Sequence, residues 1–235
     1  MNPKELALVQ GWDDTRAALE RWNLEPWSVL RAWLLWALAI GVGLLGAVWM
    51  VARASTPDPT TLLVPGVNTA GEASDALHLF GRNLLVLALH SMACVAGFMA
   101  GSSLPQIAET QTGASRWIHE KAGPLAIGFV VCATAFSLIT QAYGLGQAAS
   151  TIAAQWDTTP ATLLACILPH AVPELTALFL PLAAWIIASR AGRWNELLAA
   201  TFVTTALALP TLLTACLIEV FVSPLVIHAV IEPRV

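Results

Sequence analysis

The sequence predicts an all-α fold, namely a polytopic transmembrane helical bundle of about five spans with a proline-broken fourth helix and an N-terminal amphipathic helix. Three observations predict it. Of the 235 residues, 57% are hydrophobic and 11% are charged, which is about half the charged fraction of a soluble domain. The mean hydropathy of the chain is +0.70. Apolar runs long enough to cross a bilayer alternate with polar connections.

Residues 1–27 form a predicted N-terminal surface helix, separate from a transmembrane helical domain over 28–235. Charged residues and tryptophans are interspersed there with Leu6, Val9 and Leu19, a pattern typical of a helix at the membrane surface. A frayed cytosolic tail is the alternative. Because the segment lacks the apolar core and cleavage site of a signal peptide, we expect the first apolar helix to direct insertion.

The first three spans are predicted at 29–51, at 77–99 and from 124 to about 143. The stretch 54–75 is rich in Ser, Thr, Pro and Gly and predicts a loop. The stretch 101–123 is predicted to be a hydrophilic loop. Residues 144–157 either extend the third helix or fold back.

The fourth apolar region, 158–189, contains four prolines. Proline removes an amide donor and clashes with the preceding turn of a helix. We therefore expect a half-helix, a break near Pro169 and then a span over 173–189. The fifth span is predicted at 197–222, with a kink at Pro210.

The distribution of Lys and Arg predicts a cell-membrane protein with a cytoplasmic N-terminus, because this orientation places most of these residues inside. If the fourth region crosses twice, the C-terminus moves inside as well. The net charge is −4 and no large basic patch occurs, so nucleic acid is not expected as a partner. The four cysteines lie in apolar runs without C-x-x-C spacing and are interpreted as small buried residues.

Five polar side chains lie inside the apolar runs, where a charged group at the centre costs roughly 2.5 to 3.5 kcal/mol. Asn83 and His90 share one face of the second span, and His170 and Glu174 are spaced so that both could hold one ligand. Glu219 on the fifth span needs a partner from another helix. We therefore predict that these side chains converge in one interior pocket.

Structural roles are the alternative for each residue. Glu219 could extend to the interface, His90 could be a neutral core histidine, and Asn83 could join helices at the headgroup level. His170 and Glu174 could simply lock the kink. A zinc site would need three or four ligands, which His170 and Glu174 would reach only with His90 or Glu219.

The segment Pro169-His170-Ala171-Val172-Pro173-Glu174 resembles the P-H-G-x-x-E signature of the stage II sporulation protein M family. Ile218-Glu219-Val220-Phe221-Val222-Ser223-Pro224 is similar to its I-E-x-F-x-x-P element. Arg82-Asn83, followed by Gly97 and Gly101, is similar to its second span. The resemblance covers about residues 80–224, and the alanine at position 171 departs from the family's glycine.

This resemblance implies a multi-helix membrane protein of bacteria or archaea. The sporulation member is regarded as a scaffold that recruits peptidoglycan-degrading partners, and other relatives are associated with ATPase genes of the MoxR type or with circular bacteriocin clusters. Carried over residue by residue, the family pattern singles out Asn83, His170, Glu174 and Glu219.

Two functions follow from the sequence, and whether the protein is an enzyme stays open between them. The first is a non-enzymatic membrane scaffold or assembly factor that binds other membrane or cell-envelope proteins, needs no cofactor and could form homo-oligomers through Gly- and Ala-rich faces. The alternative is an intramembrane enzyme acting on a hydrophobic peptide, or a transporter. It would use His170, Glu174 and Glu219 as acid-base groups or, with His90, as ligands of a divalent metal such as zinc.

Overall fold

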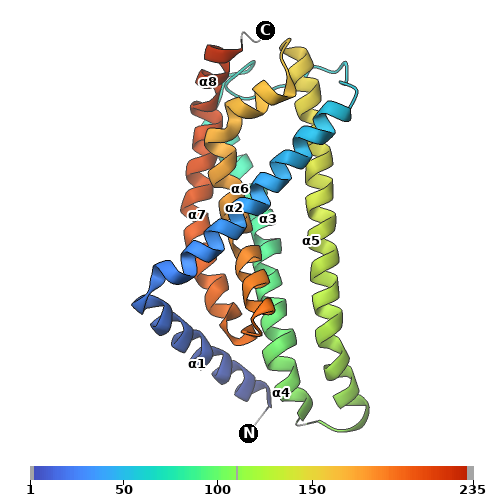
Figure 1. Cartoon of the computed structure of the whole chain (residues 1–235), viewed down its shortest axis with the longest axis vertical. Helices are drawn as coiled ribbons and strands as arrows, with labels where there is room; N and C mark the ends of the chain where they lie inside the picture. Colours follow the sequence, from blue (N-terminus) through green and yellow to red (C-terminus); the bar gives the residue numbers. More distant parts are fainter. Residues whose placement is uncertain (1–2, 110, 232–235) are drawn as a thin grey trace. The chain divides into compact units, whose positions relative to one another are not determined.

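The computed structural model describes residues 3–109 and 111–231, and it is helical over most of them (Figure 1). No β-strand occurs in these residues, so the predicted all-α class is confirmed. The elements in chain order are α1 (Pro3–Leu24), α2 (Pro26–Ala54), α3 (Ala73–Phe98), the π-helical turn η1 (Met99–Ser103), α4 (Leu104–Glu109), α5 (Gly113–Gln155), α6 (Pro160–Arg190), the 3-10 turn η2 (Trp194–Glu196), α7 (Leu197–Phe221) and α8 (Ser223–Val230).

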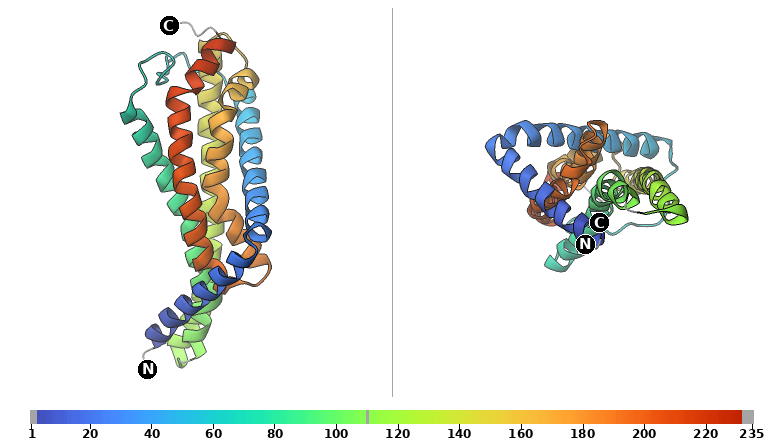
Figure 2. Two further views of the ribbon diagram at one scale, coloured as in Figure 1. Left: turned by 90° about the vertical axis from the view of Figure 1, so that its left-hand side faces the viewer. Right: turned by 90° about the horizontal axis from the view of Figure 1, so that it is seen from below.

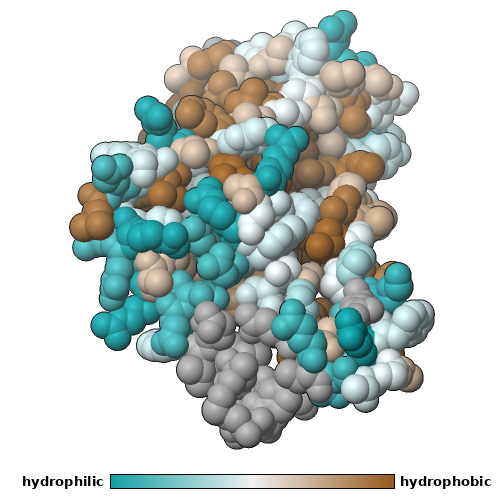
Figure 3. Space-filling model, turned by 60° about the horizontal axis from the view of Figure 1, so that its bottom comes forward, coloured by the Kyte–Doolittle hydropathy of each residue, from teal (hydrophilic) through white to brown (hydrophobic). Residues whose placement is uncertain are grey.

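Five helical stretches of the described chain are long and apolar enough to cross a membrane. Large apolar side chains on α5, among them Leu125, Phe129 and Phe136, are exposed, as expected for contact with lipid. On the face of the molecule drawn in Figure 3, hydrophobic residues in brown lie beside hydrophilic residues in teal. The chain is therefore an integral membrane protein. The five stretches are Pro26–Ala54, Ala73–Glu109, Gly113–Gln155, Pro160–Arg190 and Trp194–Val230.

The predicted hydrophilic loop over 101–123 is wrong. Residues of η1, α4 and the beginning of α5 are helical there, and α5 continues through Pro124. Polar residues such as Glu, Lys and Arg are good helix formers, so polarity alone did not indicate a loop. With 43 residues, α5 rises about 65 Å. This length exceeds the roughly 30 Å hydrocarbon core, so its polar beginning can lie outside the apolar layer.

The predicted break near Pro169 is also wrong, because α6 is one helix of 31 residues. Its ribbon changes direction in the first part of the helix but does not end there (Figure 1). A proline in a helix interior can bend the helix while its neighbours keep their own hydrogen bonds. His170 and Glu174 therefore lie one turn apart on one continuous helix.

The described chain divides into two compact units by its contacts. Unit 1 contains residues up to 37, 86–135 and 179–208, whereas unit 2 contains 38–85, 136–178 and the residues from 209 onward. Cys94, Phe98, Ala188 and Leu197 form a buried apolar cluster in unit 1. A larger cluster around Trp156 forms in unit 2. The expected division between residues 27 and 28 stays a prediction.

In unit 1, α1 and α2 meet at a corner at Glu25, which can be followed in both views of Figure 2. The ring of Trp22 on α1 lies edge-on to the ring of Trp33 on α2, with 5.1 Å between the ring centroids. Because Trp33 is 5% exposed, this aromatic contact anchors the end of α1 to the first turns of α2.

The non-helical segment between α2 and α3, in unit 2, agrees with the predicted loop. Asn68 orders it, because its Oδ1 accepts a hydrogen bond from Val64 N–H and its Nδ2 donates to the carbonyl oxygen of Leu62. The hydroxyl and backbone N–H of Thr60 both donate to Asp58 and lower the pKa of that carboxyl group. Side chains thus replace the missing ladder of helix hydrogen bonds.

Close helix packing depends on small residues in both units, as two examples show. A Cβ atom at Gly101 would lie 2.2 Å from the ring of Trp194 in unit 1. A Cβ atom at Gly146 on α5 would lie 2.6 Å from the Cβ of Val51 on α2 in unit 2. By contrast, Gly144 has no neighbour within 4 Å of such an atom. Gly146 therefore lies at a close contact between α5 and α2, whereas Gly144 does not.

Candidate metal centre

Three side chains that could hold a metal ion come together within unit 2. His170 and Glu174 project from α6 and Glu219 projects from α7, and one ligand atom of each lies within 4.8 Å of the others. The α6 pair meets because residues four apart share a helix face. His170 is 6% exposed, and both glutamates are half-buried. The cluster thus combines one imidazole with two carboxylates.

Two further polar side chains orient this cluster. Asn83 Nδ2, on α3, donates a hydrogen bond of 2.7 Å to Glu174 Oε1. His170 Nδ1 lies 2.6 Å from the hydroxyl oxygen of Ser223, the first residue of α8. Ser223 is 2% exposed, so this contact is shielded from surrounding solvent or lipid. The second nitrogen of His170 and the second oxygen of Glu174 are the atoms left to face a ligand.

The charges around the cluster are two carboxylates and one guanidinium. Glu219 interacts electrostatically with both Glu174 and Arg82. The Arg82 side chain is exposed, whereas Glu219 is half-buried. A divalent cation between the carboxylates would neutralise both of them, which removes the repulsion and much of the cost of burying them.

The donor set fits zinc in its chemistry. Imidazole nitrogen and carboxylate oxygen are both zinc ligands, at about 2.0 to 2.2 Å from the metal. Ligands of a tetrahedral zinc lie about 3.3 Å apart, whereas the three atoms here lie within 4.8 Å. Rotations of the two glutamates could supply the difference, which is at most about 1.5 Å.

The second predicted histidine is not part of this group. His90 belongs to unit 1, where it is fully buried and its ring packs against Phe179 with 5.2 Å between the ring centroids. The group of ligand atoms consists of His170, Glu174 and Glu219. Asn83, which the sequence places in the same polar pocket but not among the ligands, contacts Glu174 through its Nδ2, and this nitrogen also lies 3.6 Å from the sulfur of Cys216.

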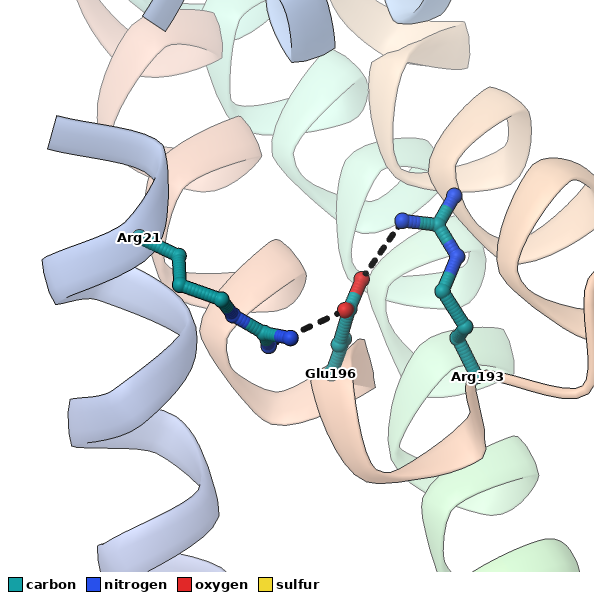
Figure 4. Close-up of polar contacts among 3 residues, drawn as sticks. All are labelled: Arg21, Arg193 and Glu196. Atoms are coloured by element: carbon teal, nitrogen blue, oxygen red, sulfur yellow. Dashed lines mark hydrogen bonds and ion pairs between the residues drawn. The ribbon is translucent and has the colours of Figure 1, made fainter. Parts of the chain in front are cut away.

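Sequence reasoning missed two functional contacts. The role of Ser223 had a weak signal, because a serine followed by proline often begins a helix, but nothing along the chain connects it to His170. Glu196 was also missed. It is 5% exposed and accepts hydrogen bonds of 3.1 Å from both Arg21 and Arg193 in unit 1 (Figure 4). A glutamate in a short polar turn between apolar runs has no sequence signal of burial.

Fold and site together define an all-helical integral membrane protein with a His–Glu–Glu cluster inside one of its units. Comparison with family models, with curated proteins and with solved structures finds no match. Membership of the stage II sporulation protein M family stays a prediction that rests on the short motifs around His170 and Glu219.

Proposed function

We propose that the protein is a metal-dependent intramembrane hydrolase that binds one divalent metal ion, zinc, through His170, Glu174 and Glu219, and that its substrate is a hydrophobic peptide. One observation carries the proposal. An imidazole and two carboxylates from α6 and α7 meet in unit 2 with their ligand atoms within 4.8 Å. Such groups are costly inside an apolar bundle, and intramembrane ionisable residues are commonly functional.

A zinc site with three protein ligands suits a catalytic role better than a structural one. A structural zinc site uses four protein ligands, whereas a catalytic one keeps a position for water, whose proton the metal makes easier to remove. Within the proposed site, Ser223 holds the imidazole of His170 through Nδ1, and Asn83 holds Glu174 through Oε1. Such outer contacts orient ligands and fix the tautomer of a ligating histidine. The surrounding apolar helices would favour an apolar peptide over a soluble one.

Zinc content of the purified full chain tests this proposal. The protein is purified in detergent, supplied with zinc, dialysed and measured by elemental analysis. We expect about one zinc per chain in the wild type, and a large loss in His170→Ala, because the remaining two ligands cannot complete the site. His228→Ala is the matched control, because His228 is an exposed histidine on α8 of the same unit. Equal zinc content in the two variants, both folded by circular dichroism, would refute the metal site.

A second function, a non-enzymatic scaffold or assembly factor for cell-envelope proteins, is favoured by a different feature of the same cluster. Its hydrogen bonds connect separate helices, since Asn83 joins α3 to α6 and His170 joins α6 to α8. In this function the cluster fixes helix packing and the metal is dispensable. The resemblance to the stage II sporulation protein M family supports it.

The variant Glu174→Gln separates the two functions. Glutamine keeps an oxygen that accepts the hydrogen bond from Asn83, but it is a poor zinc ligand. A scaffold should form the same crosslinks to envelope proteins in cells with Glu174 or Gln at this position. Loss of all these crosslinks from a folded Glu174→Gln protein would argue against the scaffold. The cytoplasmic N-terminus and homo-oligomer formation are further parts of this proposal, supported by the Lys and Arg distribution and the small-residue faces.

A further inference from the structure

Two adjoining hollows lie at the corner between α1 and α2, entirely within unit 1. The first, of about 190 Å³, is lined mainly by apolar side chains, including Leu19, Leu30 and Val203, and we call it the apolar hollow. The second, of about 380 Å³, includes four charged residues, and we call it the polar hollow. Trp22 and Val29 line both. One molecule could therefore place a polar end in one hollow and an apolar end in the other.

Two arginines are held in place in the polar hollow. Arg21 Nη2 and Arg193 Nη1 each donate to a different oxygen of Glu196, at 3.1 Å in both cases (Figure 4). The carboxylate of Glu196 is 7% exposed, whereas the side chains of Arg21 and Arg193 are 59% and 47% exposed. A guanidinium carries five N–H donors, so each arginine keeps several donors for a ligand. Paired guanidinium groups of this kind suit a phosphate.

The charged lining of the polar hollow has both signs. Arg21, Arg193, Glu25 and Glu196 line it, and their formal charges cancel. Both arginines contact Glu196, which leaves Glu25 as the exposed carboxylate of the set. Glu25 follows Arg21 by four residues at the corner between the helices. An ion of one sign would leave part of this lining unmatched, whereas a zwitterion with a phosphate and an ammonium group would match it.

We propose that unit 1 binds a phospholipid with a primary amine in its headgroup, of the phosphatidylethanolamine type. Its phosphate contacts Arg21 and Arg193, its ammonium group contacts Glu25, and one acyl chain enters the apolar hollow. The tryptophan pair Trp22 and Trp33 forms the wall along which the acyl chain passes. Aromatic rings are common at the level of lipid headgroups, where one side is apolar and the other is wet. The site is independent of the metal proposed for unit 2.

Native mass spectrometry of the full chain in detergent tests the proposal. The protein is incubated with an equimolar mixture of phosphatidylethanolamine, phosphatidylcholine and phosphatidylglycerol with identical acyl chains, and the retained lipids are counted. We expect the wild type to retain phosphatidylethanolamine roughly tenfold better than the other two lipids. Each of these lacks the charge-assisted contact between a primary ammonium group and Glu25. Glu25→Gln should remove this preference. Arg21→Gln should lower retention of all three lipids, because all three carry the phosphate.

Two control variants change residues of α1, the helix that carries Arg21. Arg16→Gln and Glu20→Gln change an exposed ion pair on α1 outside both hollows, and both should behave as the wild type. Glycerophosphoethanolamine, the headgroup without acyl chains, should not displace the lipid, because it cannot fill the apolar hollow. If Arg21→Gln does not fold, Glu25→Gln still decides. The proposal is overturned if the wild type shows no preference for the amine lipid, or if folded Glu25→Gln keeps that preference.

Discussion

Replacing Glu219 with glutamine should separate two opposing effects of its carboxylate in unit 2. Without metal, Glu219 lies close to Glu174, with the ligand atoms of the cluster within 4.8 Å of one another. Two unit charges at this separation repel by about 3.5 kcal/mol at an effective dielectric constant near 20. Proton binding by one carboxyl group can relieve part of that cost. The neutral amide, which has the same shape, should therefore stabilise the metal-free protein by about 1 to 3 kcal/mol.

With zinc present, the effect of the same change is different. Zinc at a hundred times its dissociation constant stabilises the folded protein by about 2.7 kcal/mol, and a glutamine at position 219 should remove most of this gain. For a protein of this size, about 1 kcal/mol corresponds to roughly 2 to 4 °C in Tm. The wild type should therefore gain several degrees from zinc, while Glu219→Gln starts higher and gains little.

Thermal unfolding in one detergent, with a chelator and with excess zinc, measures both effects. Glu72→Gln is the control, because Glu72 is an exposed carboxylate of unit 2 outside the cluster, and it should leave the zinc-dependent rise unchanged. The reasoning fails if Glu219→Gln keeps the full zinc-dependent rise in Tm. It also fails if the metal-free variant is less stable than the metal-free wild type.

Three further substitutions test contacts around the cluster and between helices. Ser223→Ala should weaken zinc binding roughly 10- to 100-fold by losing the contact that orients His170, and a competition titration with a zinc-binding dye should detect this; unchanged affinity would contradict the orienting role. Gly146→Ala should destabilise the protein by about 1 to 3 kcal/mol, because its Cβ would lie 2.6 Å from that of Val51. Gly144→Ala, with no neighbour within 4 Å, should be neutral or stabilise by up to about 1 kcal/mol; equal unfolding temperatures of these two variants would refute the packing argument.

The amino-acid sequence by itself determined the class of the fold. In a bilayer, backbone polar groups must find partners within the protein because the lipid offers none, so a membrane-spanning segment can only be a helix or a strand of a closed barrel. The lengths of the runs therefore predicted the helices found at Pro26–Ala54, Ala73–Phe98 and Leu197–Phe221 within a few residues. Helix ends in polar or proline-containing regions depend on small free-energy differences, which explains the errors at 101–123 and at Pro169.

The sequence also determined which residues were candidates for a site. Ionisable groups inside apolar runs carry a cost that is independent of the fold, and this argument selected His170, Glu174 and Glu219. The spacing of His170 and Glu174 follows from helix geometry alone. That Glu219 points toward them, and that Ser223 contacts His170, was decided only by how α6, α7 and α8 pack in unit 2.

The contacts in unit 1 show most clearly what the sequence alone does not determine. Arg21 and Glu196 are 175 residues apart along the chain and yet share an ion pair. Helical periodicity describes one helix at a time, so it says nothing about the rotation and pairing of two helices. The rotation and pairing of helices depend on side-chain packing, for example on the close approach of the Trp194 ring to Gly101. Only the packed tertiary structure decides such long-range contacts, and both proposed sites depend on them.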